Sequence, residues 1–289
     1  WYNVGKLRNS GFEFDLNVKL IQKKDWYWDM SVNGYTYANK MLNLPDEYKV
    51  SGMPNGNQRI YEGKDIYRWE MRQFAGLDEK GNSLWYMDRD LTDGEGNVVG
   101  VEKVTTGDAT EATQYLLEKS ALPDFTGGLN TTLRWKSLDL TIMTNFQFGG
   151  YGYDYDFSAF SSANFPMNRL KNYADAWNPE TGKGSAPIWN TNDSNINASS
   201  DRFLISKTYF NLRNITLGYT FPANWMSKIG IKSVRVYFAC DNVFFASKRK
   251  GYDPRTSMGG QGATVALNSV DGTYYSPIRT TSVGLNINF

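Results

Sequence analysis

The last nine residues, 281–289, constrain the fold of this chain more than any other segment. Apolar side chains stand at every second position, at Val283, Leu285, Ile287 and Phe289, and the residues between them are small or polar. Because successive side chains of a strand point to opposite faces, this pattern predicts a strand with one apolar and one polar wall. A soluble edge strand is usually blunted by charge or proline, and this one is not. The segment favours a membrane β-barrel, whose strands need lipid outside and water or polar packing inside.

The composition excludes a helical membrane protein and is compatible with a barrel. No apolar run of the sequence approaches the roughly 20 residues that a membrane helix needs. The mean hydropathy is −0.53, but the alternating strands of a barrel also average to a polar value. Aromatic residues make up 15% of the chain, and Tyr and Trp favour membrane–water interfaces.

Charge and residue usage exclude several classes of function. The net charge of +1 argues against a nucleic-acid partner. One cysteine allows no internal disulfide, and the absence of histidine removes the commonest general base and metal ligand. No nucleophile–base pair is recognisable, so we expect no enzymatic activity, no cofactor and no metal. The chain starts at Trp1 without a signal peptide, which predicts a processed chain or a piece of a longer one.

Alternating segments recur along the whole chain and predict about seven strands, at residues 12–20, 26–38, 125–135, 138–148, 209–221, 233–244 and 281–289. Their connections alternate strictly between short ones, at 23–25, 136–137 and 222–231, and long ones, at 39–123, 149–203 and 246–276. Outer-membrane barrels have short periplasmic turns and long external loops. We therefore expect the long connections to be extracellular and the C-terminus to lie in the periplasm.

Seven strands do not close a typical bacterial barrel, and two open sheet edges are not tolerated in lipid. The predicted fold class is therefore all-β: residues 1–289 form the C-terminal part of one antiparallel transmembrane β-barrel domain. Within the long connections, Gly81 and Asn82 predict a hairpin turn. Residues 110–119 and 169–177 predict two short helices.

Aromatic side chains predict two kinds of site. Trp26, Trp28 and Trp135 lie beside short connections, which predicts a periplasmic aromatic girdle. The long connections carry a second set, which could contact a substrate, a sugar face in particular, or a lid protein. Packing within the loops is the alternative for this set: Trp69, Trp85, Tyr86, Tyr151, Tyr153, Tyr155, Trp177 and Trp189.

The wall opposite the apolar one is polar in every predicted strand. We expect its side chains to hydrogen-bond a plug or water inside the barrel, with substrate contact as the alternative. They are Glu13, Asp15, Lys19, Asp29, Arg134, Asp139, Asn145 and Arg235. Cys240 alternates with polar-wall residues, which predicts a small apolar contact on the lipid side.

An ordered set of motifs resembles the C-terminal barrel region of SusC/RagA-type TonB-dependent outer-membrane transporters. The strongest match is SKTYFNLRNITLGYTFP at 206–222, and the C-terminal strand ends in LNINF at 285–289. The other matches are NVGKLRNSG at 3–11 followed by Glu13, PDFTGGL at 123–129, FQFGG at 146–150, Tyr153-Asp154, Asp241-Asn242 and GYDP at 251–254. Each motif alone is weak, but their common order is specific.

The resemblance implies a barrel of about 22 strands with a plug domain and TonB box that are not in this sequence. It implies import of a nutrient too large for porins, an oligosaccharide or a peptide, across the Gram-negative outer membrane. The implied partners are a SusD-like lipoprotein lid, the TonB–ExbB–ExbD motor, the barrel-assembly machinery acting on the C-terminal strand, and outer-membrane lipid. A dimer of transporter–lid pairs is also implied.

Two alternatives remain at this stage. A soluble β-sandwich that binds glycans also has alternating strands and Gly-rich turns. It would bury the apolar wall of the C-terminal strand against a second sheet. The other alternative is a barrel fragment captured during outer-membrane assembly.

Overall fold

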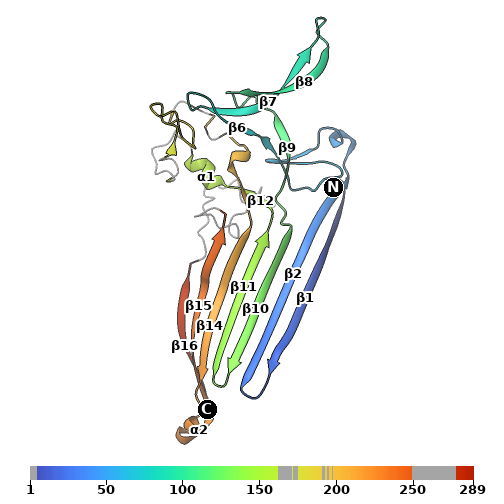
Figure 1. Ribbon diagram of the computed structural model, residues 1–289. Helices are drawn as coiled ribbons and strands as arrows, with labels where there is room; N and C mark the ends of the chain where they lie inside the picture. Colours follow the sequence, from blue (N-terminus) through green and yellow to red (C-terminus); the bar gives the residue numbers. More distant parts are fainter. Residues whose placement is uncertain are drawn as a thin grey trace.

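The computed structural model describes residues 5–161, 171, 175–190, 193, 195–196, 198–248 and 278–289. Its main feature is a seven-stranded antiparallel sheet in the order β1-β2-β10-β11-β14-β15-β16 (Figure 1). The bounds are β1 (Lys6–Gln22), β2 (Trp26–Asn43), β10 (Phe125–Trp135), β11 (Leu138–Phe148), β14 (Tyr209–Thr220), β15 (Ser233–Ser247) and β16 (Thr280–Asn288). Each of the seven predicted segments forms most of one of these strands. β1 and β16 each have a single neighbour, so the sheet is not closed.

The register places the apolar residues of neighbouring strands side by side. One row runs from Trp28 through Leu133, Leu140, Leu217 and Phe238 to Val283. The adjacent positions along each strand carry polar or small residues, as in the row from Asp29 through Thr132, Thr141 and Thr216 to Ala239. Period-two alternation in each strand therefore adds up to one continuous apolar face and one continuous polar face.

The connections divide between the two ends of this sheet. Residues 23–25, Lys136–Ser137 and residues 221–232, which contain α2 (Ala223–Met226), link neighbouring strands at the short-turn end. Residues 44–124 and 149–208 leave from the opposite, long-connection end (Figure 1). In the described part of the chain, no helix is long and apolar enough to cross a membrane.

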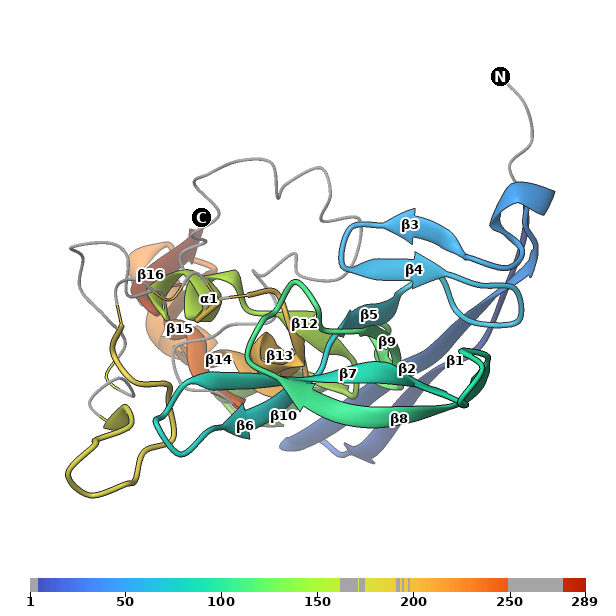
Figure 2. The ribbon, with the colours of Figure 1, turned by 90° about the horizontal axis from the view of Figure 1, so that it is seen from above.

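The described parts of residues 44–124 and 149–208 form a loop region that lies over the long-connection end of the sheet (Figure 2). One of its sheets has the order β3-β4-β5-β9, another β6-β7-β8, and a third pairs β12 with β13. The bounds are β3 (Met53–Asn55), β4 (Gln58–Ile60), β5 (Arg68–Arg72), β6 (Phe74–Leu77), β7 (Ser83–Thr92), β8 (Val98–Thr106), β9 (Gln114–Ser120), β12 (Tyr151–Tyr153) and β13 (Leu204–Ser206). The helical pieces are η1 (Asp46–Tyr48), α1 (Tyr155–Phe160) and η3 (Asp201–Phe203), with η4 (Ser227–Ile229) following α2.

The largest buried core lies in this loop region and not beneath the long sheet. It consists of Trp69, Met71, Leu117, Ala121, Tyr153, Phe203 and Leu204. The long sheet instead leaves its apolar face open: Val283 is 76% exposed and Leu285 is 58% exposed. A soluble sandwich would cover these side chains with a second sheet, and no sheet among the described residues does so.

Three expectations about the connections have definite outcomes. The hairpin at Gly81 and Asn82 is confirmed as the turn between β6 and β7. The helix expected at 110–119 is wrong, because residues 114–120 form β9, which pairs with β5 and places Leu117 in the core. The first long connection begins at residue 44 and not at 39, because β2 continues to Asn43 beside β1. The helix expected at 169–177 falls largely outside the described residues.

Candidate membrane-facing wall and loop region

Three tryptophans gather on the apolar face at the short-turn end, where the girdle is expected. Trp26 and Trp135 are register partners, and their ring centroids lie 5.7 Å apart. Trp28 donates its indole Nε1–H to Thr131 Oγ1 at 2.9 Å, so its polar edge is satisfied within the face. All three rings remain between 38% and 44% exposed. A large ring with one satisfied polar group suits a membrane interface. The role as a girdle stays a prediction.

A second aromatic belt crosses the same face near the long-connection end. The ring centroids of Phe14 and Phe125 lie 6.4 Å apart, those of Phe125 and Phe146 lie 6.1 Å apart, and those of Phe146 and Phe148 lie 5.6 Å apart. The Phe125 ring lies over Gly34, where an added Cβ would come within 2.4 Å of its Cζ. The sequence alone does not show this belt, because its members come from three strands and only the register brings them together.

The separation of the two belts matches the thickness of a membrane. Phe125 and Trp135 begin and end β10, ten residues apart. At about 3.3 Å per residue this is roughly 33 Å along the strand, and a barrel tilt of about 40° reduces it to roughly 25 Å. Outer-membrane barrels carry an apolar band about 25 Å tall between two aromatic girdles.

Side chains of the polar face form hydrogen bonds and an ion pair within that face. Arg235 donates to Asp139 through Nε at 3.1 Å and Nη2 at 2.5 Å. Asn211 donates to Asn145 Oδ1 at 2.7 Å. Asp29 Oδ1 accepts the backbone N–H of Thr132 at 3.1 Å. These expected lumen residues therefore form cross-strand links that tie the wall together. Cys240 is buried on the opposite face, level with Ile215, as expected for a small apolar residue.

The eight aromatic residues predicted in the long connections do not form one surface. Trp69 and Tyr153 are each 3% exposed and belong to the main loop-region core, and Trp85 is 2% exposed against Ala109 and Ala112. Burial of these three favours the packing alternative, because this chain's own atoms cover their rings. Tyr151 and Tyr155 pack half-buried against the main core.

The remaining three residues of that set do not belong to the main core. The Nζ of Lys103 lies 4.4 Å from the ring centroid of Tyr86, which is half-buried. Trp177 is half-buried against Gly81, where an added Cβ would lie 2.2 Å from its Cγ. Trp189 is 47% exposed. Contact with a substrate or lid stays a prediction for the exposed and half-buried members.

Comparison with known proteins explains this architecture. TonB-dependent receptor P3 of Formosa agariphila is 25% identical over 308 residues, and TonB-dependent receptor SusC of Bacteroides thetaiotaomicron is 26% identical over 294 residues. These matches cover 99% of this chain but 29% and 27% of the two relatives. The RagAB peptide transporter structure is 26% identical with a TM-score of 0.75, over 99% of this chain and 30% of that chain. The resemblance to SusC/RagA-type TonB-dependent receptors is confirmed.

The chain thus spans about 30% of the length of the proteins that it matches. A second RagAB structure, described as a peptide importer in the 'closed-closed' state, gives a TM-score of 0.76 at 26% identity. No protein-family model matches the chain. The relatives are receptors and transporters, which favours the expectation that this chain has no enzymatic activity.

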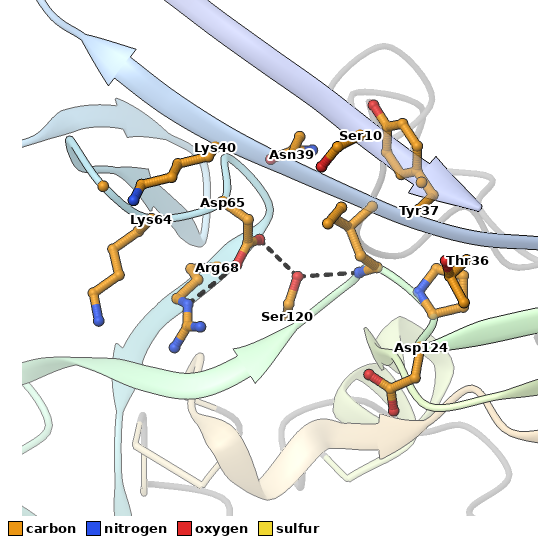
Figure 3. Close-up of a pocket in the computed structure, with 15 residues that line it drawn as sticks. Ser10, Thr36, Tyr37, Asn39, Lys40, Lys64, Asp65, Arg68, Ser120 and Asp124 are labelled. Atoms are coloured by element: carbon orange, nitrogen blue, oxygen red, sulfur yellow. Dashed lines mark hydrogen bonds and ion pairs between the residues drawn. The ribbon is translucent and has the colours of Figure 1, made fainter.

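A cavity of about 730 Å³ lies where the long sheet meets the loop region (Figure 3). It opens because β2 continues to Asn43, whereas its pairing with β10 stops at Tyr35. The cavity lining combines the upper part of the β1–β2 hairpin with residues 63–68 and 120–124. Asp65 is held at its edge, because Oδ2 accepts Arg68 Nε at 3.1 Å and Oδ1 accepts Ser120 Oγ at 2.7 Å. The cavity could not be predicted from the sequence, because its walls come from segments that are distant along the chain.

Proposed function

We propose that this chain forms the C-terminal part of the barrel wall of a TonB-dependent outer-membrane importer. The observation that carries the proposal is the apolar face of the seven-stranded sheet, bounded by two aromatic belts and backed by a polar face. Lipid would cover the apolar face, and the polar face would line the lumen. A sheet with free edges at β1 and β16 cannot stand alone in lipid. Strands from the part of the relatives that this chain does not span would complete a barrel of about 22 strands.

The orientation follows from the lengths of the connections. The short-turn end would face the periplasm, together with the C-terminus, and the loop region would be extracellular. In this orientation the Trp26, Trp28 and Trp135 rings lie at the periplasmic interface, and the phenylalanine belt lies at the outer one. The apolar side chains of β16 (Val283, Leu285, Ile287 and Phe289) would be recognised by the barrel-assembly machinery.

The cargo would be a nutrient too large for porins, an oligosaccharide or a peptide. A wide barrel leaks unless it is plugged, so a plug coupled to TonB–ExbB–ExbD would control passage. A SusD-like lipoprotein would cover the loop region, in dimeric transporter–lid pairs. The similarity to the RagAB peptide transporter and to SusC supports this class of assembly, without deciding between the two kinds of cargo.

Uptake by cells tests the proposal. Cells that carry the full-length gene, the same cells without it, and cells that lack TonB are compared on labelled oligosaccharides and mixed peptides. We expect saturable uptake of one substrate class that requires both the full-length gene and TonB. Uptake that persists without TonB, or no difference between cells with and without the gene, would refute import.

A further inference from the structure

A pair of like charges faces outward just above the phenylalanine belt. Arg8 of β1 and Lys40 of β2 are direct register partners. Arg8 alternates in phase with Phe12, which is 66% exposed on the apolar face, so the pair lies on that face. Arg8 is four positions from Phe12, which places the charge about 13 Å further along the strand. This depth corresponds to lipid headgroups when the belt lies at the membrane interface.

Nothing in the described part of the chain neutralises this pair. Neither the Arg8 nor the Lys40 side chain makes an ion pair or hydrogen bond with a described residue. Like charges directly opposite each other on one face destabilise a sheet. The carboxylate of Glu118 pairs with Arg68, and its other oxygen lies 4.0 Å from Lys64 Nζ, so it bonds neither Arg8 nor Lys40. The pair therefore lacks an anion that an external ligand would supply.

The cavity next to the pair is rich in hydrogen-bond donors. Lys40 and Lys64 both line it, and an added Cβ at the neighbouring Gly63 would lie 4.0 Å from Lys40 Cε. Asn39 also lines the cavity, but it alternates with Lys40 along β2, so its side chain points to the other face of the sheet. Lys40 therefore joins the outward-facing pair to the cavity.

The two acidic residues of the cavity do not oppose an anion at the lysines. Asp65 already accepts hydrogen bonds from Arg68 and Ser120 and one from the Tyr67 backbone at 3.1 Å. Figure 3 draws Asp124 at the opposite end of the cavity from Lys40 and Lys64. The cationic end is also the end that adjoins Arg8, since Arg8 and Lys40 are partners.

We propose that Arg8, Lys40 and Lys64 bind the phosphate of an anionic lipid headgroup at the outer rim of the wall. The site rests on the membrane placement in the proposed function, though not on import itself. The phosphate oxygens would accept from the two lysines and Arg8. The acyl chains would lie along the apolar face beside Phe12. Charge complementarity and the position above the belt favour a lipid over a soluble phosphate.

The test measures lipid binding to the full-length protein in uncharged detergent. Diphosphorylated lipid A, dephosphorylated lipid A and inorganic phosphate are titrated in turn and followed by native mass spectrometry. We expect binding of the diphosphorylated lipid alone. Arg8→Ala or Lys40→Ala should weaken it about fivefold, and the double variant about thirty-fold. The matched control is Lys24→Ala, which removes an exposed cation at the opposite end of the same hairpin.

The site is refuted if dephosphorylated lipid A binds as tightly as the diphosphorylated form, or if the double variant binds as tightly as the wild type. It is also refuted if Lys24→Ala weakens binding as much as the Arg8 and Lys40 variants do. Competition by inorganic phosphate at the same affinity would overturn it too, because it would indicate a soluble anion. A thermal unfolding transition recorded for each variant shows whether that variant is folded. Arg8→Gln should raise the unfolding temperature in lipid-free detergent, because it relieves the repulsion, and lipid A should stabilise this variant less than the wild type. A negative result would refute the lipid site and leave the proposal of TonB-dependent uptake standing, because lipid binding is measured without TonB.

Discussion

Arg235 and Asp139 form a bidentate ion pair that passes over Gly218. Arg235 lies on β15 and Asp139 on β11, and β14 runs between them. Gly218 is the register partner of Asp139, and a Cβ there would lie 2.3 Å from Arg235 Nη2 and 2.6 Å from Asp139 Oδ1. The missing side chain on the middle strand thus allows an ion pair between next-nearest strands. Such a link couples three strands of the wall at once.

Replacing Gly218 should break this link. Gly218→Val places side-chain atoms where the guanidinium lies, and we expect a loss of about 1–3 kcal/mol in the free energy of unfolding. Urea titration in detergent, followed by tryptophan fluorescence, measures it. Gly100→Val is the matched control, because the nearest atom to its Cβ would be 3.8 Å away. An equal loss in an Arg235→Ala background would contradict the steric cause.

A charged side chain should destabilise the protein on the apolar face and be tolerated on the polar face. Ile215 and Thr216 are neighbours on β14, level with Thr131 near the middle of β10, but on opposite faces. Ile215→Arg would put a cation into lipid and should cost about 2–4 kcal/mol. Thr216→Arg should cost at most about 1 kcal/mol. Heat-modifiable gel migration of the full-length protein reports barrel formation. Equal tolerance of both variants would exclude lipid on the Ile215 side.

Two loop tryptophans should behave differently although they look alike in sequence. Trp69 is 3% exposed and donates Nε1–H to the Tyr151 carbonyl at 3.2 Å, whereas Trp189 is 47% exposed. Trp69→Ala should destabilise the loop region by about 3–5 kcal/mol, and Trp189→Ala by less than about 0.5 kcal/mol. Limited proteolysis across a denaturant series compares the two. A resistant Trp69→Ala protein would show that the core does not depend on this ring.

Alkaline pH should weaken the loop region through Tyr115. Burial of its phenol, followed by its hydrogen bond to Asp88 Oδ1 at 2.6 Å, raises the pKa of Tyr115 from 10.0 to about 12. The folded state therefore holds this proton more tightly than the unfolded state. Its contribution to stability is complete below pH 10 and is lost as the pH rises through about 12. Tyr115→Phe should remove this part of the pH dependence, which unfolding curves across that range would show. An unchanged slope would mean that another group titrates.

Period-two alternation in the sequence predicted the long strands, the two faces and the division into short and long connections. Segments such as 125–135 and 281–289 carry this information locally, because neighbouring residues of a strand must point in opposite directions. The loop region could not be predicted, because its strands pair with segments that are distant in the sequence. Residues 110–119 read as a helix, but pairing of β9 with β5 outweighed the local preference. The aromatic loop residues also gave no local sign of which rings would be buried.

The sequence by itself determined that this chain forms alternating strands with one lipid-compatible side, because that property repeats within each strand. Only the tertiary structure decided which side chains meet across strands: the phenylalanine belt, the ion pair over Gly218, and Arg8 opposite Lys40. These relationships depend on register. Register is set by the whole sheet, since a shift of one residue would send every apolar side chain to the other face.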